Sequence, residues 1–250
     1  MSGPRLSVNI NKIATLRNSR GGALPSPIDA ARVAIAAGAP GITVHPRADE
    51  RHITRTDVIG LTHLIGPRRR EVEFNIEGEP RPDLLDLVRE VRPHQCTLVP
   101  VRPGEITSQA GWPPDTPADE MRQIVADLRD RHIRVSLFID PEVDAVKWAA
   151  SMGADRIELY TEPFARAFKQ SEEACAESFA RYVEAANHAH ALGLGINAGH
   201  DLDLHNLVAF RTLPYLDEVS IGHALISHAI YVGLSQAVRD YLAACRIGRA

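Results

Sequence analysis

Side chains that can move protons stand near the ends of several short apolar runs. His45 ends residues 41–45, Glu77 ends residues 71–77, and Glu158 lies within residues 156–161. The reference pKa values of carboxyl and imidazole groups are about 4.3 and about 6.5, and burial or pairing can move both towards neutral pH. Several such groups at one site could serve repeated acid-base steps on carbonyl substrates.

Amide and basic side chains accompany these groups at the other run ends. The candidates at these positions are Asn9, Asn11, Lys12, His45, Arg47, Glu77, Glu158, Asn197, His200, Gly222 and His223. Each of them alone could be a solvated loop residue, because strands surface into water. Their convergence on the ends of successive runs favours a site.

Basic residues near the same ends indicate anion recognition, and phosphate is the anion that fits them best. These residues and their polar neighbours are Arg20, Arg47, His52, Thr107 and His223. Gly199 and Gly222 would let backbone N–H groups approach an anion closely. For each basic residue taken singly, a solvated surface charge is the commoner reading.

The elements that must position these residues are eight short β-rich runs, each followed by a helix-like segment. The runs are residues 6–10, 41–45, 71–77, 95–100, 134–140, 156–161, 195–198 and 218–223. Strict alternation of strands and helices predicts a parallel sheet, and nearly continuous apolar runs such as 135–139 are typical of strands buried on both faces. Eight units in 250 residues match one closed (β/α)8 barrel, expected as a single domain over residues 1–250.

An open doubly wound sheet is the alternative architecture, and it would need a glycine-rich turn after the first strand to bind a nucleotide. No such turn follows residues 8–10. The first helix is predicted to start at Pro27 with Ser26 as its cap, and Gly38 can close it. The polar, proline-rich residues 103–119 are read as a long loop, and they and the segment 161–171 are expected to be the most mobile parts of the mouth.

Composition excludes several classes of protein. The net charge of −4 gives no electrostatic footprint for nucleic acid or an anionic membrane. No run of about 18 apolar residues and no signal segment is visible, so we expect a soluble cytoplasmic protein. The three cysteines are too few and too widely spaced for a disulfide framework, which fits a reducing compartment.

Three features invite a functional interpretation but are better explained structurally. His188 and His190 have metal-ligand spacing, yet residues two apart on a helix point to different faces. Residues 68–70 are three arginines that fit a solvated turn at the bottom of the barrel, and Cys96 fits a small core residue.

Motifs along nearly the whole chain, from Leu6 to about Ala243, resemble the pyridoxine 5'-phosphate synthase family. They include residues 13–18 (IATLRN), 41–45 (GITVH), 51–54 (RHIT), 135–140 (VSLFID), 197–200 (NAGH) and 221–224 (IGHA). The resemblance implies a barrel with additional helices, a homo-octamer built from dimers, and no metal or organic cofactor. It also implies the joining of 1-deoxy-D-xylulose 5-phosphate to 3-amino-2-oxopropyl phosphate, with release of inorganic phosphate and water.

The resemblance also implies roles for individual residues. By position, His45 and Glu77 are similar to the family's proton acceptors, His200 to its proton donor, and Glu158 to the residue that stabilises the transition state. The residues similar to its substrate and phosphate contacts are Asn9, Arg20, Arg47, His52, Thr107, Gly222 and His223.

Departures from the family pattern affect the contacts at two strand ends. Asn11 and Lys12 stand where members of the family carry Asp and His, and Asp201 replaces a frequent glycine. Lysine keeps a cation for phosphate but lacks the neutral acceptor form of imidazole, so all three residues are expected to bind substrate rather than to act as acids or bases. Pro46 is a further local change.

Two alternative functions remain open at this point. Another phosphosugar aldolase or isomerase could share the fold and its phosphate loops. A Schiff-base aldolase would need a lysine at the end of a middle strand, where Glu158 stands, while Lys147 and Lys169 fall in helical segments. A non-catalytic binding or assembly barrel is the second alternative, and it leaves the convergence of acidic and imidazole groups unexplained.

Overall fold

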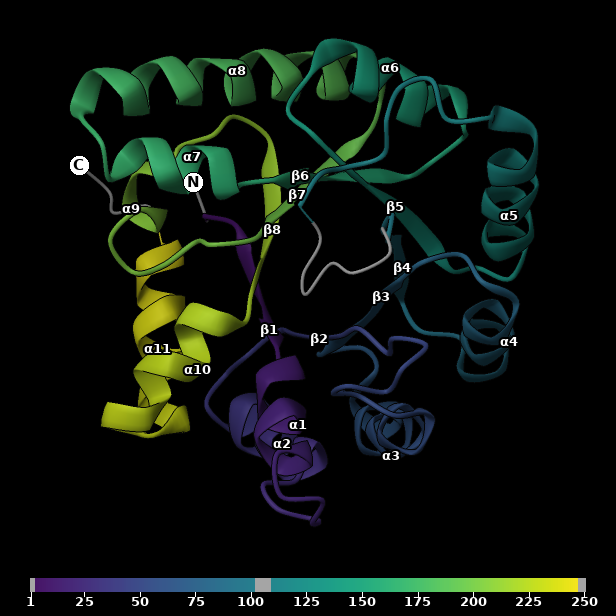
Figure 1. Ribbon diagram of the computed structural model, residues 1–250, viewed down its shortest axis with the longest axis vertical. Coiled ribbons are helices and arrows are strands. Elements are labelled where there is room, and N and C mark those ends of the chain that lie inside the picture. The colour runs from purple at the N-terminus through teal and green to yellow at the C-terminus, as the bar shows by residue number, and fades with distance from the viewer. Residues whose placement is uncertain (1–2, 102–108, 247–250) are drawn as a thin grey trace.

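A computed structural model describes residues 3–101 and 109–246, in which eight parallel strands close into a barrel in chain order (Figure 1). The strands are β1 (Arg5–Asn9), β2 (Gly41–Val44), β3 (Glu73–Gly78), β4 (Gln95–Leu98), β5 (Arg134–Ile139), β6 (Arg156–Tyr160), β7 (Gly195–Gly199) and β8 (Leu216–Ile221). β8 pairs with β1 through Arg5 to Val8, which completes the ring. The predicted (β/α)8 barrel is confirmed, and each strand lies within two residues of its expected bounds.

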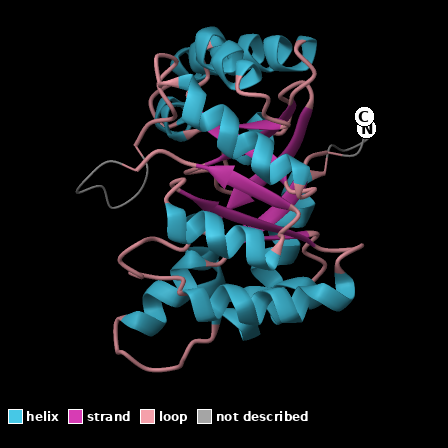
Figure 2. Ribbon diagram, turned by 90° about the vertical axis from the view of Figure 1, so that its right-hand side faces the viewer, coloured by secondary structure: helices cyan, strands magenta, loops and turns pink. Residues whose placement is uncertain are grey.

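Helices surround the strands on the outside, as the side view in Figure 2 shows. They are α1 (Asn11–Asn18), α2 (Pro27–Ala36), α3 (Arg55–Ile65) with the short η1 (Gly66–Arg68), α4 (Pro82–Val91), α5 (Ala118–Asp130), α6 (Val143–Ser151), α7 (Glu162–Phe168), α8 (Glu172–Ala191), α9 (Leu207–Phe210), α10 (His223–Val232) and α11 (Leu234–Cys245). Several connections therefore carry more than one helix, as expected for a barrel with additional helices.

The start of the first helical connection differs from the prediction. Ser26 does cap α2, with its hydroxyl oxygen accepting a hydrogen bond from the Asp29 N–H at 3.2 Å. An unpredicted helix, α1, precedes it and begins at Asn11 directly after the first strand. Its N-cap, Ile10, makes no side-chain capping bond, so the usual sequence signal for a helix start is missing.

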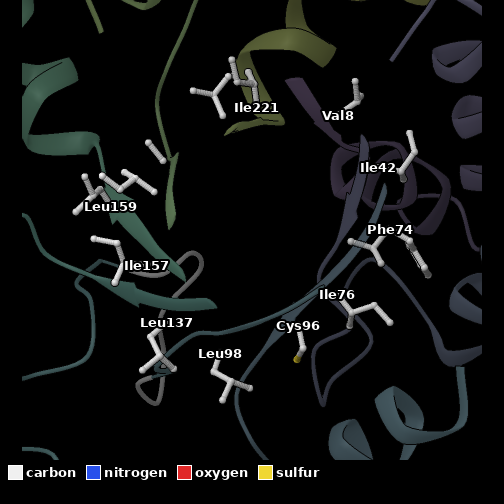
Figure 3. Close-up of a cluster of buried hydrophobic side chains, with 14 of the residues drawn as sticks. Val8, Ile42, Phe74, Ile76, Cys96, Leu98, Leu137, Ile157, Leu159 and Ile221 are labelled. Atoms are coloured by element: carbon white, nitrogen blue, oxygen red, sulfur yellow. The ribbon is translucent and has the colours of Figure 1, made fainter. Parts of the chain in front are cut away.

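Apolar side chains on the outer face of the barrel form the main core. Val8, Ile42, Leu137 and Ile157 are fully buried members of a cluster that lies between strands and helices (Figure 3). Because side chains alternate along a strand, the residues between these positions point into the barrel. The outer face therefore supplies most of the hydrophobic stabilisation.

The strands are buried on both faces, as expected, but many side chains on the inner face of the barrel are polar. The Ser7 and Thr43 hydroxyls lie 2.6 Å apart, and the Thr97 hydroxyl donates to the Asn75 side-chain oxygen at 3.1 Å. Barrels of this class usually fill their interior with bulky branched side chains. Here hydrogen-bonded polar groups replace them, which is the arrangement that buried polar atoms require.

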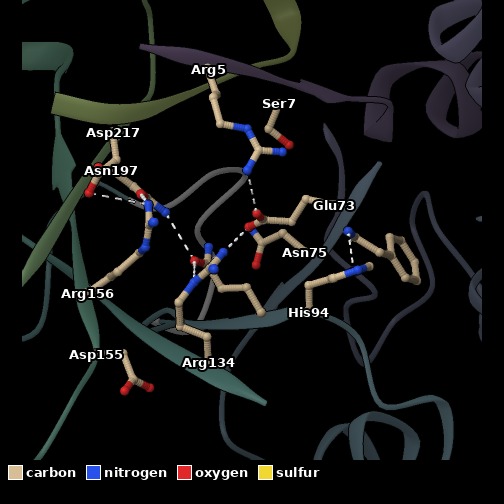
Figure 4. A network of polar contacts seen from close by, with 12 residues as sticks. Arg5, Ser7, Glu73, Asn75, His94, Arg134, Asp155, Arg156, Asn197 and Asp217 are labelled. Atoms are coloured by element: carbon tan, nitrogen blue, oxygen red, sulfur yellow. Dashed lines mark hydrogen bonds and ion pairs between the residues drawn. The ribbon is translucent and has the colours of Figure 1, made fainter. Parts of the chain in front are cut away.

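Charged residues close the N-terminal end of the barrel, where each strand begins (Figure 4). Arg5 and Arg134 both pair with the buried carboxylate of Glu73. Arg156 donates to the Asn197 side-chain oxygen at 2.7 Å. The arginines at these strand starts hold the bottom of the barrel together, away from the end where the strands finish.

The three features interpreted structurally from the sequence lie where that interpretation places them. His188 and His190 are exposed on α8 on either side of the buried Ala189. Residues 68–70 are exposed beside η1. Cys96 is fully buried, and burial raises the pKa of its thiol to about 12. Within residues 3–101 and 109–246, no helix is long and apolar enough to cross a membrane.

Candidate active site

The C-terminal ends of the strands bring the predicted acid-base residues to one end of the barrel. His45 follows β2, Glu77 lies near the end of β3, and His200 follows β7. Glu158 points inward from the middle of β6, because it stands between the outward-facing Ile157 and Leu159. This is the end at which barrel enzymes carry their active sites.

His45 and Glu77 form the centre of this arrangement. The His45 Nδ1 atom lies 3.9 Å from the Glu77 Oε2 atom, and both residues are only 8% exposed. Asn9 donates to Glu77 Oε2 at 3.5 Å, and Ser220 donates to Glu77 Oε1 at the same distance. The Glu77 carboxyl group therefore lies among the side chains of His45, Asn9 and Ser220.

Asn11 links the first two strand ends and so positions His45. Its side-chain oxygen accepts a hydrogen bond from the His45 backbone N–H at 2.9 Å. Its own N–H donates to the Asn9 side-chain oxygen at 3.0 Å. The replacement of the family's Asp by Asn11 keeps the acceptor that this contact needs.

The pKa values of His45 and Glu77 are shifted in opposite directions. Burial, and next the nearby His52 and Arg47, lower the pKa of His45 to about 3, so its imidazole is neutral at physiological pH. Its Nε2 atom is buried and has no hydrogen-bond partner among the described residues. Burial raises the pKa of Glu77 to about 8, against the opposing hydrogen bond from Ser220. A neutral imidazole therefore faces a carboxyl group that exchanges its proton near neutral pH.

Glu158 is a second buried carboxyl group inside the barrel. It is 4% exposed, and its Oε2 atom has no hydrogen-bond partner among residues that the structure describes. Burial first, and then the charge of Glu77, raise the pKa of Glu158 well above its usual value. A carboxyl group in this state can donate a proton or a hydrogen bond to a bound molecule.

His200 stands on a backbone turn that few residues adopt. Its φ is +93° and that of Asp201 is +58°, in the left-handed region that favours glycine. The Thr161 hydroxyl donates to the carbonyl oxygens of Gly199, at 2.8 Å, and of His200. The Tyr160 ring also contacts the His200 ring edge-on at 5.1 Å. Thr161 therefore supports the turn, a role that its position at a predicted strand end did not reveal.

Asp201 contacts His200 directly. The His200 Nδ1 atom lies 2.9 Å from the Asp201 Oδ2 atom, and this hydrogen bond is the main cause that lowers the pKa of Asp201. A carboxylate at Nδ1 orients the imidazole ring and leaves Nε2 free of this contact. The replacement of glycine by Asp201 thus adds an acceptor beside the expected proton donor.

Cationic side chains gather on the other side of the mouth, around His45 and His52. Burial first, and then the charges of Arg47 and Lys12, lower the pKa of His52 to about 4. The His52 Nδ1 atom accepts a hydrogen bond from the Ile53 N–H at 2.9 Å, so the ring can present Nε2–H outward. This side can attract anions.

The end of β8 offers a further anion-binding position. Gly222 precedes α10, whose first residue is the exposed His223. An added Cβ at Gly222 would lie 3.1 Å from the side-chain oxygen of Asn9, so the lack of a side chain lets β1 and β8 come together here. The first N–H groups of a helix are natural donors to phosphate.

Arg20 is the predicted contact that the described residues do not tie to this group. Arg20 lies in an exposed turn that joins α1 and α2 at the edge of the molecule (Figure 1), and no side-chain hydrogen bond or ion pair among the described residues ties it to the mouth. A cavity of about 480 Å³ lies beside this turn and is lined by Arg17, Gly21 and Thr54, among others, away from the acid-base residues. Thr107 lies outside the described residues.

No cluster of His, Cys, Asp and Glu able to hold a metal ion occurs in residues 3–101 and 109–246. The arrangement instead joins neutral and charged acid-base groups to a cationic rim. Residues 6–247 match the model of one protein family, described as pyridoxal phosphate biosynthesis protein PdxJ. The chain belongs to this family.

Relatives named pyridoxine 5'-phosphate synthase cover almost the whole chain. The protein of Porphyromonas gingivalis is 52% identical over 95% of this chain and 97% of its own length. The protein of Bacteroides fragilis is 50% identical over the same shares, and that of Leptospira biflexa is 48% identical over 98% of each chain. The family resemblance inferred from the motifs is therefore confirmed.

Solved structures with the same architecture are much more distant. A tryptophan synthase chain from M. tuberculosis matches with a TM-score of 0.67 at 12% identity, covering 99% of this chain and 94% of its own. Thiamine phosphate pyrophosphorylase from Pyrococcus furiosus matches with a TM-score of 0.61 at 11% identity, over 96% and 95% of the two chains. At such identities the likeness shows the barrel fold alone.

Proposed function

We propose that this chain is a pyridoxine 5'-phosphate synthase, which condenses 1-deoxy-D-xylulose 5-phosphate with 3-amino-2-oxopropyl phosphate to form pyridoxine 5'-phosphate in vitamin B6 biosynthesis. Inorganic phosphate and water are the other products. The observation that carries the proposal is the neutral, buried His45 facing the protonatable Glu77 at the mouth of a barrel from this family.

Proton transfers are the chemistry that this reaction requires. Imine formation, dehydration, loss of phosphate and aromatisation each move protons at different atoms, more than one acid-base pair could easily serve. His45 and Glu77 are the proposed proton acceptors, and His200, beside Asp201, is the proposed donor. Glu158 is proposed to stabilise charge in the transition state. These steps call for no metal or organic cofactor.

Two phosphate groups must enter the mouth, and two separate regions could receive them. Lys12, Arg47 and His52 form the cationic side proposed for one phosphate, with Asn9 and Asn11 contacting the substrate. The backbone around Asp201 and the turn at Gly222 and His223 form the proposed second site. Thr107 and Arg20 stay proposed contacts on family resemblance alone.

The proposal extends to assembly and location. The end of α10 exposes Ile230 and Tyr231, with 75% and 87% of their surface accessible, which supports burial against another chain. We propose a homo-oligomer, an octamer as the family resemblance implies, acting in the cytoplasm. The whole chain is proposed to act as one domain without nucleic acid or membrane partners.

A crystal structure with both phosphorylated compounds bound tests the proposed sites. We expect one phosphate against the backbone of residues 199–201 and 222–223 and the other beside Lys12 and Arg47. An isomerase would hold only one phosphorylated ligand at the mouth, and a binding barrel would leave both compounds unchanged. Anions found only at the arginine-lined bottom would contradict the proposal.

A further inference from the structure

Gly199 and Glu158 approach each other more closely than any larger residue at position 199 would allow. A Cβ atom built on Gly199 would lie 2.5 Å from the Glu158 Oε1 atom. In the pairing of β6 with β7, Glu158 is opposite Asn197, so Gly199 lies two residues further along the same inner face. The Glu158 carboxyl group therefore occupies the space that a side chain at position 199 would fill.

Few polar contacts hold the Glu158 carboxyl group. Its Oε2 atom has no hydrogen-bond partner among the described residues. The hydroxyl of the neighbouring Thr97, which also contacts Asn75 at 3.1 Å, forms a hydrogen bond with the carboxyl group. Packing against the bare backbone of Gly199 is thus the contact that limits where the carboxyl group can stand on the side away from Thr97.

We propose that Gly199 is a positioning residue that sets the location of the Glu158 carboxyl group by having no side chain. The inference rests on the proposed function, because that function assigns the Glu158 carboxyl group its role in the transition state. Gly199 takes no part in the chemistry itself and acts only through Glu158.

The surroundings predict that Gly199→Ala moves Glu158 without unfolding the barrel. Beyond Glu158, the nearest atom to the added Cβ is the Ser220 carbonyl oxygen at 3.4 Å, an ordinary contact distance. The atom that must move is the end of a flexible side chain, which can rotate more easily than a strand can shift. Alanine should therefore displace the carboxyl group by a small distance while the strand pairing stays intact.

A displacement of this kind should appear in turnover. Misplacing a reacting group by about 1 Å can lower the rate about 10²-fold. We expect Gly199→Ala to lower kcat by about that factor with a smaller change in KM, because alanine keeps the backbone N–H that is proposed to meet phosphate. The melting temperature should stay close to that of the unchanged protein.

Glu158→Asp supplies the test of mechanism, because its side chain is shorter by one methylene group and no longer reaches the position of the added Cβ. Gly199→Ala should then lower kcat strongly in the protein that carries Glu158, and only slightly when it is combined with Glu158→Asp. Such non-additivity of two substitutions is expected of groups in contact. Gly195→Ala is the matched control. It adds a Cβ in the same strand at the bottom of the barrel, against the flexible Arg156 and Asp217 side chains.

A measurement made without substrate can test the position of the Glu158 carboxyl group independently of the proposed function. The NMR resonance of the Glu158 carboxyl carbon, identified by its loss in Glu158→Gln, should shift in Gly199→Ala and stay in place in Gly195→Ala. An unshifted resonance, or an equal loss of kcat in both Glu158 backgrounds, overturns the role of Gly199. A shifted resonance in a protein that forms no pyridoxine 5'-phosphate upholds the positioning and refutes the proposed function.

Discussion

At the scale of single residues, burial explains why these particular side chains could do the proposed chemistry. The same loss of water lowers the pKa of His45 and raises that of Glu77, because it disfavours the charged form of each. The usual order of the two pKa values is therefore reversed. The imidazolium of His45 is the stronger acid, and the carboxyl group of Glu77 titrates near pH 8.

Glu77→Gln tests this inversion. The amide keeps the shape but cannot accept a proton, so kcat should fall about 10²-fold or more with substrate affinity little changed. In the unchanged protein kcat/KM should rise with pH up to about 8, as Glu77 loses its proton and becomes a base. That rise should be absent in the variant. Near-normal turnover together with a lower melting temperature would instead mark Glu77 as structural.

Lys12 replaces a histidine of the family pattern, and it tests the cationic side of the mouth. Lys12→Met should raise the KM of a phosphorylated substrate about tenfold or more, the effect of losing one charged hydrogen bond, while kcat changes less. Lys12→His should restore part of the affinity. Lys147→Met, on the outer helix α6, is the control. An unchanged KM in Lys12→Met would show that the cation does not meet phosphate.

At the scale of elements, strand ends position the site and could be predicted well, whereas turns between them could not. His45, Glu77 and His200 do lie at or just after the ends of β2, β3 and β7, and these ends share one side because the strands of the barrel are parallel. The left-handed backbone at residues 200–201 could not be predicted from the sequence, because this conformation is typical of glycine and not of His or Asp. α1 was missed because its N-cap residue, Ile10, is not a residue type that usually begins a helix.

Thr161→Val tests how that turn is held. The variant keeps the shape of the side chain but removes the hydroxyl that donates to Gly199 and His200. We expect a loss of about 1 kcal/mol in the free energy of unfolding and a lower kcat, because the turn that carries His200 relaxes. Thr161→Ser should retain both properties. If kcat is unchanged in Thr161→Val, the turn needs no such support.

At the scale of the whole molecule, the barrel separates a reactive mouth from a charged base, with a polar interior between them. This interior has a visible signal in the sequence, since Glu73, Asn75 and Glu77 alternate with apolar residues along one run. In residues 135–139 the signal is weaker, because Phe138 points inward beside the small Ser136. The pairing of Arg5 and Arg134 with Glu73 spans distant strands and becomes visible only in the closed barrel.

The buried Glu218 at the N-terminal end of the barrel should make the free energy of unfolding depend on pH. Burial first, and then the charge of Glu73, raise its pKa to about 8, so the folded chain keeps a proton that the unfolded chain releases at about pH 4.3. This contribution to stability is complete below the unfolded pKa and is lost as pH rises through the folded pKa. Glu218→Gln should therefore gain stability relative to the unchanged protein as pH rises from about 4.3 to about 8.

Melting temperatures measured across that pH range check this prediction. The exposed Glu71→Gln is the control, because it removes a carboxyl group of the same type near the same end of the barrel. Equal pH dependence in Glu218→Gln and in the unchanged protein would show that Glu218 is not protonated in the folded state.

The central claim is that the mouth of this barrel joins two phosphorylated ketones. The most direct measurement follows pyridoxine 5'-phosphate and inorganic phosphate together, in mixtures of the purified protein with both substrates and with each one alone. We predict that the two products appear in equal amounts, and only when both substrates are present. Conversion of either substrate alone, or phosphate release without formation of the ring, would contradict the account.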